Sequence, residues 1–386
     1  MKALVFRAEW APRDPSDLVG SDLAGLRARM ASRVLRNPGF ALEEVPDPTP
    51  GHGQVVVRVR RCGVCGSDTH LRETDEEGYV RFSGPTRCTC VLGHEYSGEV
   101  VALGPGVRQL RVGELVAGEG MLACGSCEAC RRGMPNQCPH LDMLGFSAPG
   151  AFADYVVSDE RFLWSLDALA ARLGDATQAL ELGALVEPVA CSYNGMFVKA
   201  GGFLPGGHVV VFGGGPIGLG AVALARAAGA ATVTVFETVA ARREIARQFG
   251  ADVVCDPRAV DAVAQIRETT RGWGADMIVE AAGAALDTLP VIEQSFAPGG
   301  KMVYLGRTGL RAPVMLDTLV TMAAGIHGAR GHSGGGCFPA IVRLMEAGRL
   351  PLAAMITARL PFPRVIEALD RSCTREDAKI LVTMDD

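Results

Sequence analysis

Between residues 208 and 306 the sequence alternates regularly between apolar β-branched runs and longer amphipathic runs. HVVVFG, TVTVFE, DMIVEA and KMVYLG are typical of buried strands, and the segments between them have apolar residues at helical spacing. Strict alternation of strand and helix predicts a doubly wound parallel sheet. We therefore expect an α/β fold class, with this sheet in a domain at residues 196–330.

The rest of the chain has a different pattern. Short apolar runs such as 55–61 and 98–104 are separated by glycine and proline, which predicts strands joined by turns. We expect a second, mostly β domain formed by residues 1–195, to which the chain returns at residues 331–386.

A glycine motif follows the first predicted strand of the parallel sheet. Gly213, Gly215 and Gly218 form G-x-G-x-x-G, the motif opens a predicted helix, and Glu237 ends the next predicted strand. In this context the motif predicts a dinucleotide site, in which the loop and the helix N-terminus face the pyrophosphate. The cofactor-binding residues expected from this pattern are Gly213, Gly215, Pro216, Ile217, Gly218, Glu237 and Arg242.

Glu237 bears on the choice between NAD and NADP. Its carboxylate can accept hydrogen bonds from both ribose hydroxyls and would repel a 2′-phosphate, which favours NAD. Arg242 and Arg243 lie close enough in sequence to leave the alternative open.

Four cysteines at C-x2-C-x2-C-x7-C spacing occupy one short segment. Four thiolates can close a tetrahedral zinc site that leaves no position for a substrate. The segment therefore predicts a structural zinc site at Cys124, Cys127, Cys130 and Cys138.

A second set of candidate ligands lies upstream. Cys65, His94 and Glu95 offer a thiolate, an imidazole and a carboxylate, which suit a catalytic zinc with one open position. Glu187 is an alternative third ligand; because Pro188 follows it, we expect Glu187 in an extended turn. Taken singly, Cys65 and His94 would more often be buried structural residues.

Ser67 and His70 lie beside these ligands in the sequence. A hydroxyl and an imidazole can form a proton relay near neutral pH, although a turn hydroxyl and a surface histidine are the alternative. The other cysteines do not belong to either set of candidate metal ligands. We expect buried or surface thiols at Cys62, Cys88, Cys90, Cys191, Cys255, Cys337 and Cys373.

Composition limits the remaining function classes. The net charge is −5 and there is no basic run of five residues, which argues against nucleic-acid binding. No run of 18 uncharged apolar residues is present and the start does not resemble a signal peptide, so we expect no membrane span and a cytoplasmic protein. Twelve cysteines then point to metal ligands and free thiols.

These motifs resemble the medium-chain dehydrogenase/reductase family, in particular its zinc-dependent alcohol and polyol dehydrogenases. The resemblance implies a GroES-like catalytic domain and a Rossmann domain, NAD as cofactor, one catalytic and one structural zinc, and a dimer or tetramer. It assigns Cys65 and His94 to the catalytic zinc and the four-cysteine set to the structural zinc. Glu187-Pro188 stands where classical alcohol dehydrogenases have a cysteine ligand. This is similar to the sorbitol and threonine dehydrogenase branch, in which Glu95 or Glu187 would approach the metal.

Two insertions, at 11–40 and 71–91, distinguish the chain within that family. With TDEEGY (74–79) and GHSGGGCFP (331–339), they resemble the scyllo-inosose 3-dehydrogenase-like branch, which implies a cyclitol or aminocyclitol substrate. The acidic residues of the second insertion could accept hydrogen bonds from such a ring, or could form a solvated loop; they are Glu73, Asp75, Glu76 and Glu77.

Two alternative functions stay open. One is an amino-alcohol (threonine-type) or simple secondary alcohol dehydrogenase on the same scaffold. The other is a nucleotide-binding redox sensor, against which the candidate open zinc site and the Ser67–His70 relay argue.

Overall fold

The computed structural model describes residues 1–14, 25–307 and 309–384; residues 15–24 of the first insertion lie outside the described residues. The chain divides into two compact units, Met1–Glu187 with Ile356–Asp386 and Pro188–Met355. The chain thus returns to the first unit at Ile356, later than the 330/331 boundary predicted from the sequence. The intervening segment belongs to the second unit because its 3-10 turn Leu352–Met355 packs on that unit's helices.

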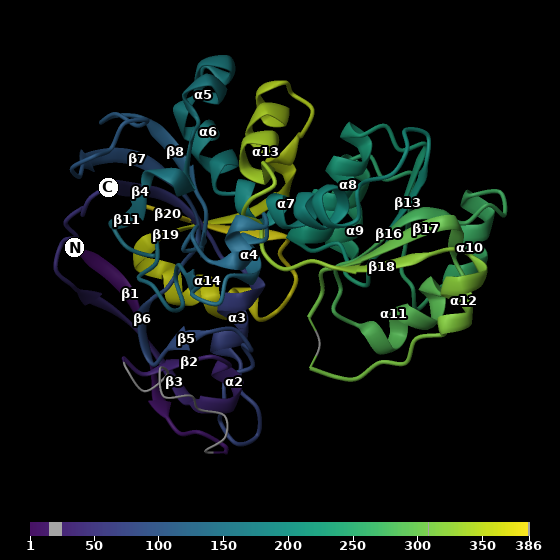
Figure 1. The fold of residues 1–386 in the computed structure, drawn as a ribbon, viewed down its shortest axis with the longest axis horizontal. Helices are drawn as coiled ribbons and strands as arrows, with labels where there is room; N and C mark the ends of the chain where they lie inside the picture. Colours follow the sequence, from purple (N-terminus) through teal and green to yellow (C-terminus); the bar gives the residue numbers. More distant parts are fainter. Residues whose placement is uncertain (15–24, 308, 385–386) are drawn as a thin grey trace. The chain divides into compact units, whose positions relative to one another are not determined.

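The first unit is mostly β, as its alternating short apolar runs predict. Its largest sheet has the order β12-β8-β7-β4-β20-β19, with β11 also paired to β4, and a smaller sheet has the order β3-β1-β6. Apolar residues of these sheets share one core with the insertions. The strands are β1 (Lys2–Trp10), β2 (Arg27–Ala28), β3 (Leu35–Glu44), β4 (Gln54–Gly63), β5 (Thr86–Arg87), β6 (Thr89–Val91), β7 (Glu95–Leu103), β8 (Leu115–Gly118), β9 (Met121–Leu122), β10 (Asp142–Met143), β11 (Tyr155–Asp159), β12 (Leu163–Ser165), β19 (Ile356–Pro361) and β20 (Lys379–Thr383) (Figure 1).

Short helices connect these strands. They are α2 (Ala31–Val34), α3 (Gly66–Arg72), α4 (Glu128–Arg131), α5 (Asp167–Leu173), α6 (Ala176–Gly183) and α14 (Val365–Ser372). A further helix, α7 (Val186–Tyr193), contains the boundary between the two units and continues into a π-helical turn, Asn194–Lys199.

The second unit is a six-stranded, all-parallel sheet of order β15-β14-β13-β16-β17-β18. Numbered along the chain this is 3-2-1-4-5-6, the Rossmann order, which confirms the predicted doubly wound sheet. The strands are β13 (His208–Phe212), β14 (Thr232–Phe236), β15 (Val253–Cys255), β16 (Ala275–Glu280), β17 (Phe296–Tyr304) and β18 (Gly325–Gly328).

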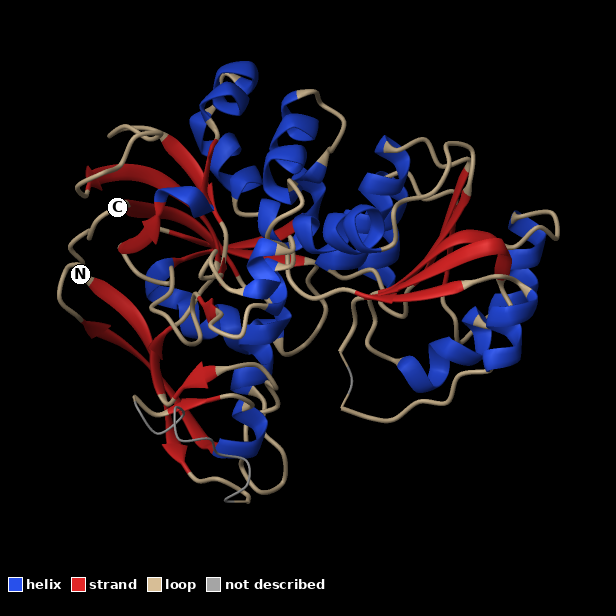
Figure 2. Cartoon of the chain, viewed as in Figure 1, coloured by secondary structure: helices blue, strands red, loops and turns tan. Residues whose placement is uncertain are grey.

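Helices cover both faces of the parallel sheet (Figure 2). One face carries α8 and α9; the other carries α10, α11 and α12, which share an apolar cluster with the strands. The helices of this unit are α8 (Pro216–Ala227), α9 (Ala240–Gln248), α10 (Ala262–Thr269), α11 (Ala285–Ile292), α12 (Leu316–Thr321) and α13 (Cys337–Glu346). Helices α8 and α9 each stop one residue before a C-cap that precedes a left-handed glycine, Gly229 or Gly250, a conformation in which glycine carries no steric penalty.

Within the described part of the chain, every helix falls short of the length and apolar character needed to cross a membrane.

Candidate functional site

The register of strands β4 and β7 brings the three upstream ligand candidates together. Gly63, the last residue of β4, pairs with Glu95, the first residue of β7. Cys65 and His94 extend just beyond that pair. The ligand atoms of Cys65, His94 and Glu95 lie within 4.8 Å of one another. A side chain at Gly63 would displace the Glu95 carboxylate, because its Cβ would lie 2.2 Å from Oε2.

The Glu95 carboxylate is buried, and among the described residues one of its two oxygens has a partner while the other has none. Its Oε2 forms an ion pair with Lys379 of β20, whereas Oε1 has no hydrogen-bond partner. A buried carboxylate oxygen without a partner is costly unless a cation or a donor approaches it. This orphaned oxygen, beside a thiol and an imidazole, fits a zinc ion.

Asp68 is a site residue that our sequence analysis did not single out. It is fully buried on α3, accepts the Cys65 backbone N–H at 2.9 Å, and has Oδ1 3.7 Å from His94 Nδ1. Burial raises the pKa of Asp68 to about 6. Its place three residues after Cys65, in the first turn of a helix, was the available signal.

The negative groups around His94 create a field that favours a cation. Burial lowers the pKa of His94, but Asp68, Cys65 and Glu187 outweigh that effect and raise this pKa to about 10. The same field would stabilise a bound divalent metal.

Glu187 lies outside the group formed by Cys65, His94 and Glu95. The extended turn predicted for it is wrong: Glu187 lies in the first turn of α7. Pro188 is tolerated there because the first N–H groups of a helix have no intrahelical partner. Since its charge acts on His94, Glu187 is near enough to stay an alternative third ligand.

Ser67 and His70 lie one turn apart on α3. Ser67 Oγ is 3.4 Å from His94 Nε2. The His70 side chain is 46 % exposed, and its Nδ1 lies 3.2 Å from Glu73 Oε2. One hydroxyl thus lies beside a ligand candidate, and an imidazole on the same helix reaches solvent.

The four-cysteine set has the geometry of a tetrahedral sulfur site. Cys138 Sγ lies 3.6 Å from Cys124 Sγ and 3.8 Å from Cys127 Sγ. Zn–S bonds of about 2.3 Å in a tetrahedron place sulfurs roughly 3.8 Å apart. Backbone N–H groups of Ser126 and Cys127 lower the pKa of Cys124 to about 5, which favours a thiolate there, whereas burial raises the pKa of Cys130 and of Cys138. Within the described residues, none of the twelve cysteines forms a disulfide.

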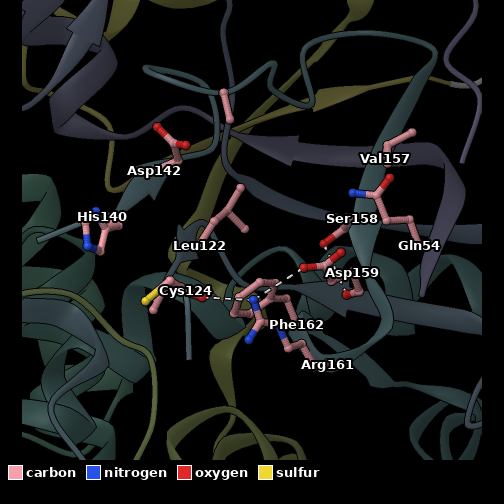
Figure 3. Close-up of a pocket in the computed structure, with 12 residues that line it drawn as sticks. Gln54, Leu122, Cys124, His140, Asp142, Val157, Ser158, Asp159, Arg161 and Phe162 are labelled. Carbon is pink, nitrogen blue, oxygen red and sulfur yellow. Dashed lines mark hydrogen bonds and ion pairs between the residues drawn. The ribbon is translucent and has the colours of Figure 1, made fainter. Parts of the chain in front are cut away.

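A pocket of about 280 Å³ lies beside this cysteine segment (Figure 3). At its wall, Arg161 donates from Nη2 to the Ala123 carbonyl at 2.9 Å and approaches Asp159 at 3.4 Å. These contacts tie the cysteine segment to the end of strand β11. Gly125 makes room for the guanidinium, since a Cβ there would lie 2.6 Å from Arg161 Nη1.

The glycine motif forms the turn between β13 and α8. Gly213 has a positive φ of 96°, and a Cβ at Gly218 would lie 1.8 Å from the Gly213 carbonyl oxygen. A Cβ at Gly215 would have Arg242 Nη1 as its nearest neighbour, 3.9 Å away. The loop is thus tight where it packs on itself and open at Gly215, followed by Pro216 and Ile217 at the start of α8. This shape fits a pyrophosphate approached by backbone N–H groups.

Glu237 holds this loop from the neighbouring strand. Its Oε2 accepts the Gly214 N–H at 2.5 Å and its Oε1 accepts the Val239 N–H at 2.7 Å. The Thr238 hydroxyl also donates to Oε1, at 3.2 Å, so Oε2 is the oxygen that keeps a second lone pair for a ribose hydroxyl. Arg243 is engaged by the Glu237 and Thr238 carbonyls and by Asp256.

The acidic residues of the second insertion mostly have partners within the first unit. Asp75 and Glu77 pair with Arg13 of the first insertion, and Asp75 also accepts two N–H groups of its own loop. Glu73 pairs with Arg375. Glu76 is exposed.

Cys191 is the thiol whose surroundings differ most from our expectation. It lies on α7 with its Sγ 3.9 Å from His332 Nδ1, in the second unit. No local pattern predicts this pair, because 141 residues separate Cys191 from His332.

Two family models match the chain: the alcohol dehydrogenase GroES-like domain at residues 51–168 and the zinc-binding dehydrogenase at residues 216–347. Scyllo-inosose 3-dehydrogenase of Thermotoga maritima is 37 % identical and covers 100 % of this chain and 99 % of that protein. L-threonine 3-dehydrogenase of Saccharopolyspora erythraea is 34 % identical over 89 % of this chain and 96 % of its own.

Solved structures show the same architecture. A Thermotoga maritima protein described as an alcohol dehydrogenase superposes with a TM-score of 0.95 at 36 % identity, covering 99 % of both chains. A Sinorhizobium meliloti zinc-binding dehydrogenase bound to NADP superposes with a TM-score of 0.78 at 25 % identity, again covering 99 % of both.

Proposed function

This chain belongs to the zinc-binding dehydrogenases of the alcohol dehydrogenase family, and we propose that it interconverts a secondary alcohol and a ketone on a cyclitol or aminocyclitol, with NAD(H). The observation that carries the substrate class is the 37 % identity, over the whole chain, to a scyllo-inosose 3-dehydrogenase. The alignment covers both insertions, whereas that with the threonine enzyme covers 89 % of the chain.

We assign the catalytic zinc to Cys65 and His94, with Glu95 or Glu187 as third ligand, and the structural zinc to the four-cysteine set. The unpartnered Glu95 oxygen and the negative field at His94 support the first assignment, and the sulfur–sulfur distances support the second. A zinc ion with an open position acts as a Lewis acid and lowers the pKa of a bound hydroxyl.

The chain's own residues then handle the proton. Ser67 Oγ, beside His94, accepts the proton of the substrate hydroxyl as it gives up its own O–H proton toward His70. His70 passes it to solvent, since its side chain is 46 % exposed and Glu73 orients its Nδ1. Removal of that proton prepares the carbon to give up hydride to the nicotinamide.

In the second unit, Gly213, Gly215 and Gly218 form the pyrophosphate turn, and Glu237 accepts the ribose hydroxyls. The Glu237 carboxylate lies next to Gly214, where it would repel a 2′-phosphate, and this favours NAD over NADP. Arg242, whose guanidinium lies near Gly215, would pair with the pyrophosphate instead of a 2′-phosphate.

We also propose a homo-oligomer formed through the β18 edge of the parallel sheet. Among the described residues, strand β18 pairs with β17 alone, and apolar side chains around it are exposed: Met315 (59 %), Leu316 (69 %), Val320 (79 %) and Ile326 (39 %). An open edge beside apolar surface suits a second copy of the chain. If two copies of the chain associate through this face, Val320→Asp should lower the molecular mass measured by light scattering. An unchanged mass would exclude an oligomer formed through this face.

The proposed function is tested by an NAD-reduction screen over cyclitols, aminocyclitols, sugars, L-threonine and short-chain alcohols. We expect a cyclitol or aminocyclitol to have the highest kcat/KM, because a site built for several hydroxyls discriminates strongly against analogues that lack them. A preference for L-threonine would establish the amino-alcohol alternative, and the absence of NAD reduction with every substrate of the screen would favour the redox sensor.

A further inference from the structure

Phe82, in the second insertion, lies where both insertions reach the candidate catalytic zinc site. The Ser32 N–H of the first insertion donates to the Phe82 carbonyl at 2.8 Å. The Phe82 N–H in turn donates to the His70 carbonyl at 3.0 Å, at the end of α3. The Phe82 backbone thus joins the first insertion to α3, the helix that follows Cys65.

The Phe82 ring leads to a zinc ligand through one intermediate. It stacks on Phe146 with ring centroids 4.5 Å apart, and Phe146 contacts the His94 imidazole at 5.0 Å. The three side chains are 6 %, 1 % and 6 % exposed, in the same order. The second insertion also holds Phe146 directly, because the Arg87 N–H donates to the Phe146 carbonyl at 3.0 Å.

Packing against Phe146 supplements a weak polar contact at His94 Nδ1. A zinc-binding histidine is normally oriented by a hydrogen bond from its second ring nitrogen. Here Nδ1 has no hydrogen-bond partner in the described structure, since Asp68 Oδ1 is 3.7 Å away. The face of Phe146 therefore supports the orientation of the ring together with the longer Asp68 ion pair and the Ser67 hydroxyl.

We propose that Phe82 is a positioning residue for the catalytic zinc, and that the two insertions support His94 through the Phe82–Phe146 stack. This inference rests on the zinc assignment of the proposed function. It gives the insertions a role in holding a metal ligand, distinct from any contact with substrate.

Gly84 provides a second way to move the ring. A Cβ at Gly84 would lie 2.4 Å from Phe82 Cζ and 2.6 Å from Phe82 Cε1, and it would approach no other group as closely. The backbone at Gly84 lies outside the left-handed region, so alanine brings no backbone strain there. Gly84→Ala should therefore displace the Phe82 ring while its chemistry is unchanged.

The test compares Phe82→Leu and Gly84→Ala with two controls from the same part of the chain. Gly39→Ala meets only ordinary contact, with Arg7 O at 3.9 Å. Phe40→Leu removes a ring that contacts Phe6 and lies under Arg72 at the C-terminal end of α3, away from Cys65. Each purified full-length variant is loaded with cobalt(II), and the visible spectrum of the quartet site, measured on Cys65→Ala, is subtracted. Zinc affinity is then measured by chelator competition, and thermal unfolding reports on stability.

We expect both ring variants to shift the cobalt bands and to weaken zinc binding at the catalytic site about tenfold, the size typical of a lost outer-shell support. In a double-mutant cycle, Gly84→Ala should add little to Phe82→Leu, because the shorter side chain no longer meets the new methyl group. The controls should keep the wild-type spectrum and affinity.

Ring variants with a wild-type cobalt spectrum and zinc affinity would overturn the inference, whatever their thermal stability. Equal spectral shifts in the controls would also overturn it, because the effect would then be a general loosening of the lobe. If Cys65→Ala had the same cobalt bands as the wild-type protein, the zinc assignment itself would be refuted.

Discussion

Lys379 and Glu95 form an ion pair in which both side chains are 1 % exposed. Lys379 Nζ also donates to the Val64 carbonyl at 2.9 Å, just before Cys65. Burial lowers the pKa of Lys379, but Glu95 and Cys65 outweigh it and raise this pKa. The pair therefore holds a positive charge beside the ligand candidates and fixes one oxygen of Glu95.

Removing the lysine should destabilise the first unit. Lys379→Met leaves the Glu95 carboxylate buried without its counter-ion, and breaking such a pair typically costs about 3–5 kcal/mol. We expect a loss of about 3 kcal/mol in the free energy of unfolding of the zinc-free protein, measured by urea denaturation. The double variant Glu95→Gln/Lys379→Met should recover much of it. A single variant as stable as wild type would show that the pair contributes nothing.

The two zinc sites should respond differently to the loss of one ligand. Cys127→Ala opens a closed structural site, so bound zinc should fall from about two to about one per chain and the Tm should drop. Cys65→Ala should abolish turnover and leave the Tm of the zinc-free protein close to wild type, because β4 and β7 still pair. Cys88→Ala, a thiol outside both sets, is the control. Normal kcat in Cys65→Ala would contradict the catalytic assignment.

Glu237 should set the preference for NAD. Glu237→Ala removes the acceptor for the ribose hydroxyls, and a hydrogen bond to a charged group contributes about 1.5–3 kcal/mol. We expect kcat/KM for NAD to fall roughly tenfold or more while that for NADP falls less or rises. The measurement is steady-state kinetics with both cofactors. Equal values for the two cofactors in the wild type would refute the preference.

Local patterns in the sequence were enough to predict the parallel sheet. The strands from β13 to β18 are short apolar runs between helices, and right-handed crossovers place those helices on the faces of the sheet. The grouping of Cys65, His94 and Glu95 was also predictable from their sequence motifs. Cys65 follows β4, whereas His94 directly precedes and Glu95 begins β7, the strand that pairs with β4.

The missed features depend on contacts that are distant in sequence. Lys379 lies 284 residues after Glu95, and no local signal connects a lysine in a late strand to a carboxylate in an early one. The end of the second unit was placed too early because the turn Leu352–Met355 packs on helices more than a hundred residues earlier. Glu187 was misplaced because the conformational preference before proline was weighed above the tolerance of a first helical turn.

The acidic insertion residues should matter more for folding than for substrate. Asp75 bonds two backbone N–H groups and pairs with Arg13, so Asp75→Ala should lower the Tm by a few degrees, consistent with roughly 1 kcal/mol. Glu76→Ala, at an exposed position, should leave the Tm unchanged. For both variants we expect kcat/KM on the preferred cyclitol to stay near wild type. A large kinetic loss with zinc retained would instead show that these carboxylates contact the substrate.

Glu280 should make the stability of the second unit depend on pH. It is fully buried at the end of β16, where burial raises its pKa even though backbone N–H groups such as that of Ala284 oppose the shift. The folded state therefore binds a proton more tightly than the unfolded state, whose carboxyl titrates near 4.5. Stability from this group is fully present below that pH and is lost as the pH rises through the folded pKa.

Glu280→Gln does not titrate, so its Tm should exceed that of the wild type by more at pH 8 than at pH 5. Each kcal/mol corresponds to roughly 2–4 °C in a domain of this size. Glu268→Gln, an exposed carboxylate in the same unit, is the matched control, and a Tm difference for Glu280→Gln that is constant from pH 5 to pH 8 would contradict the raised pKa.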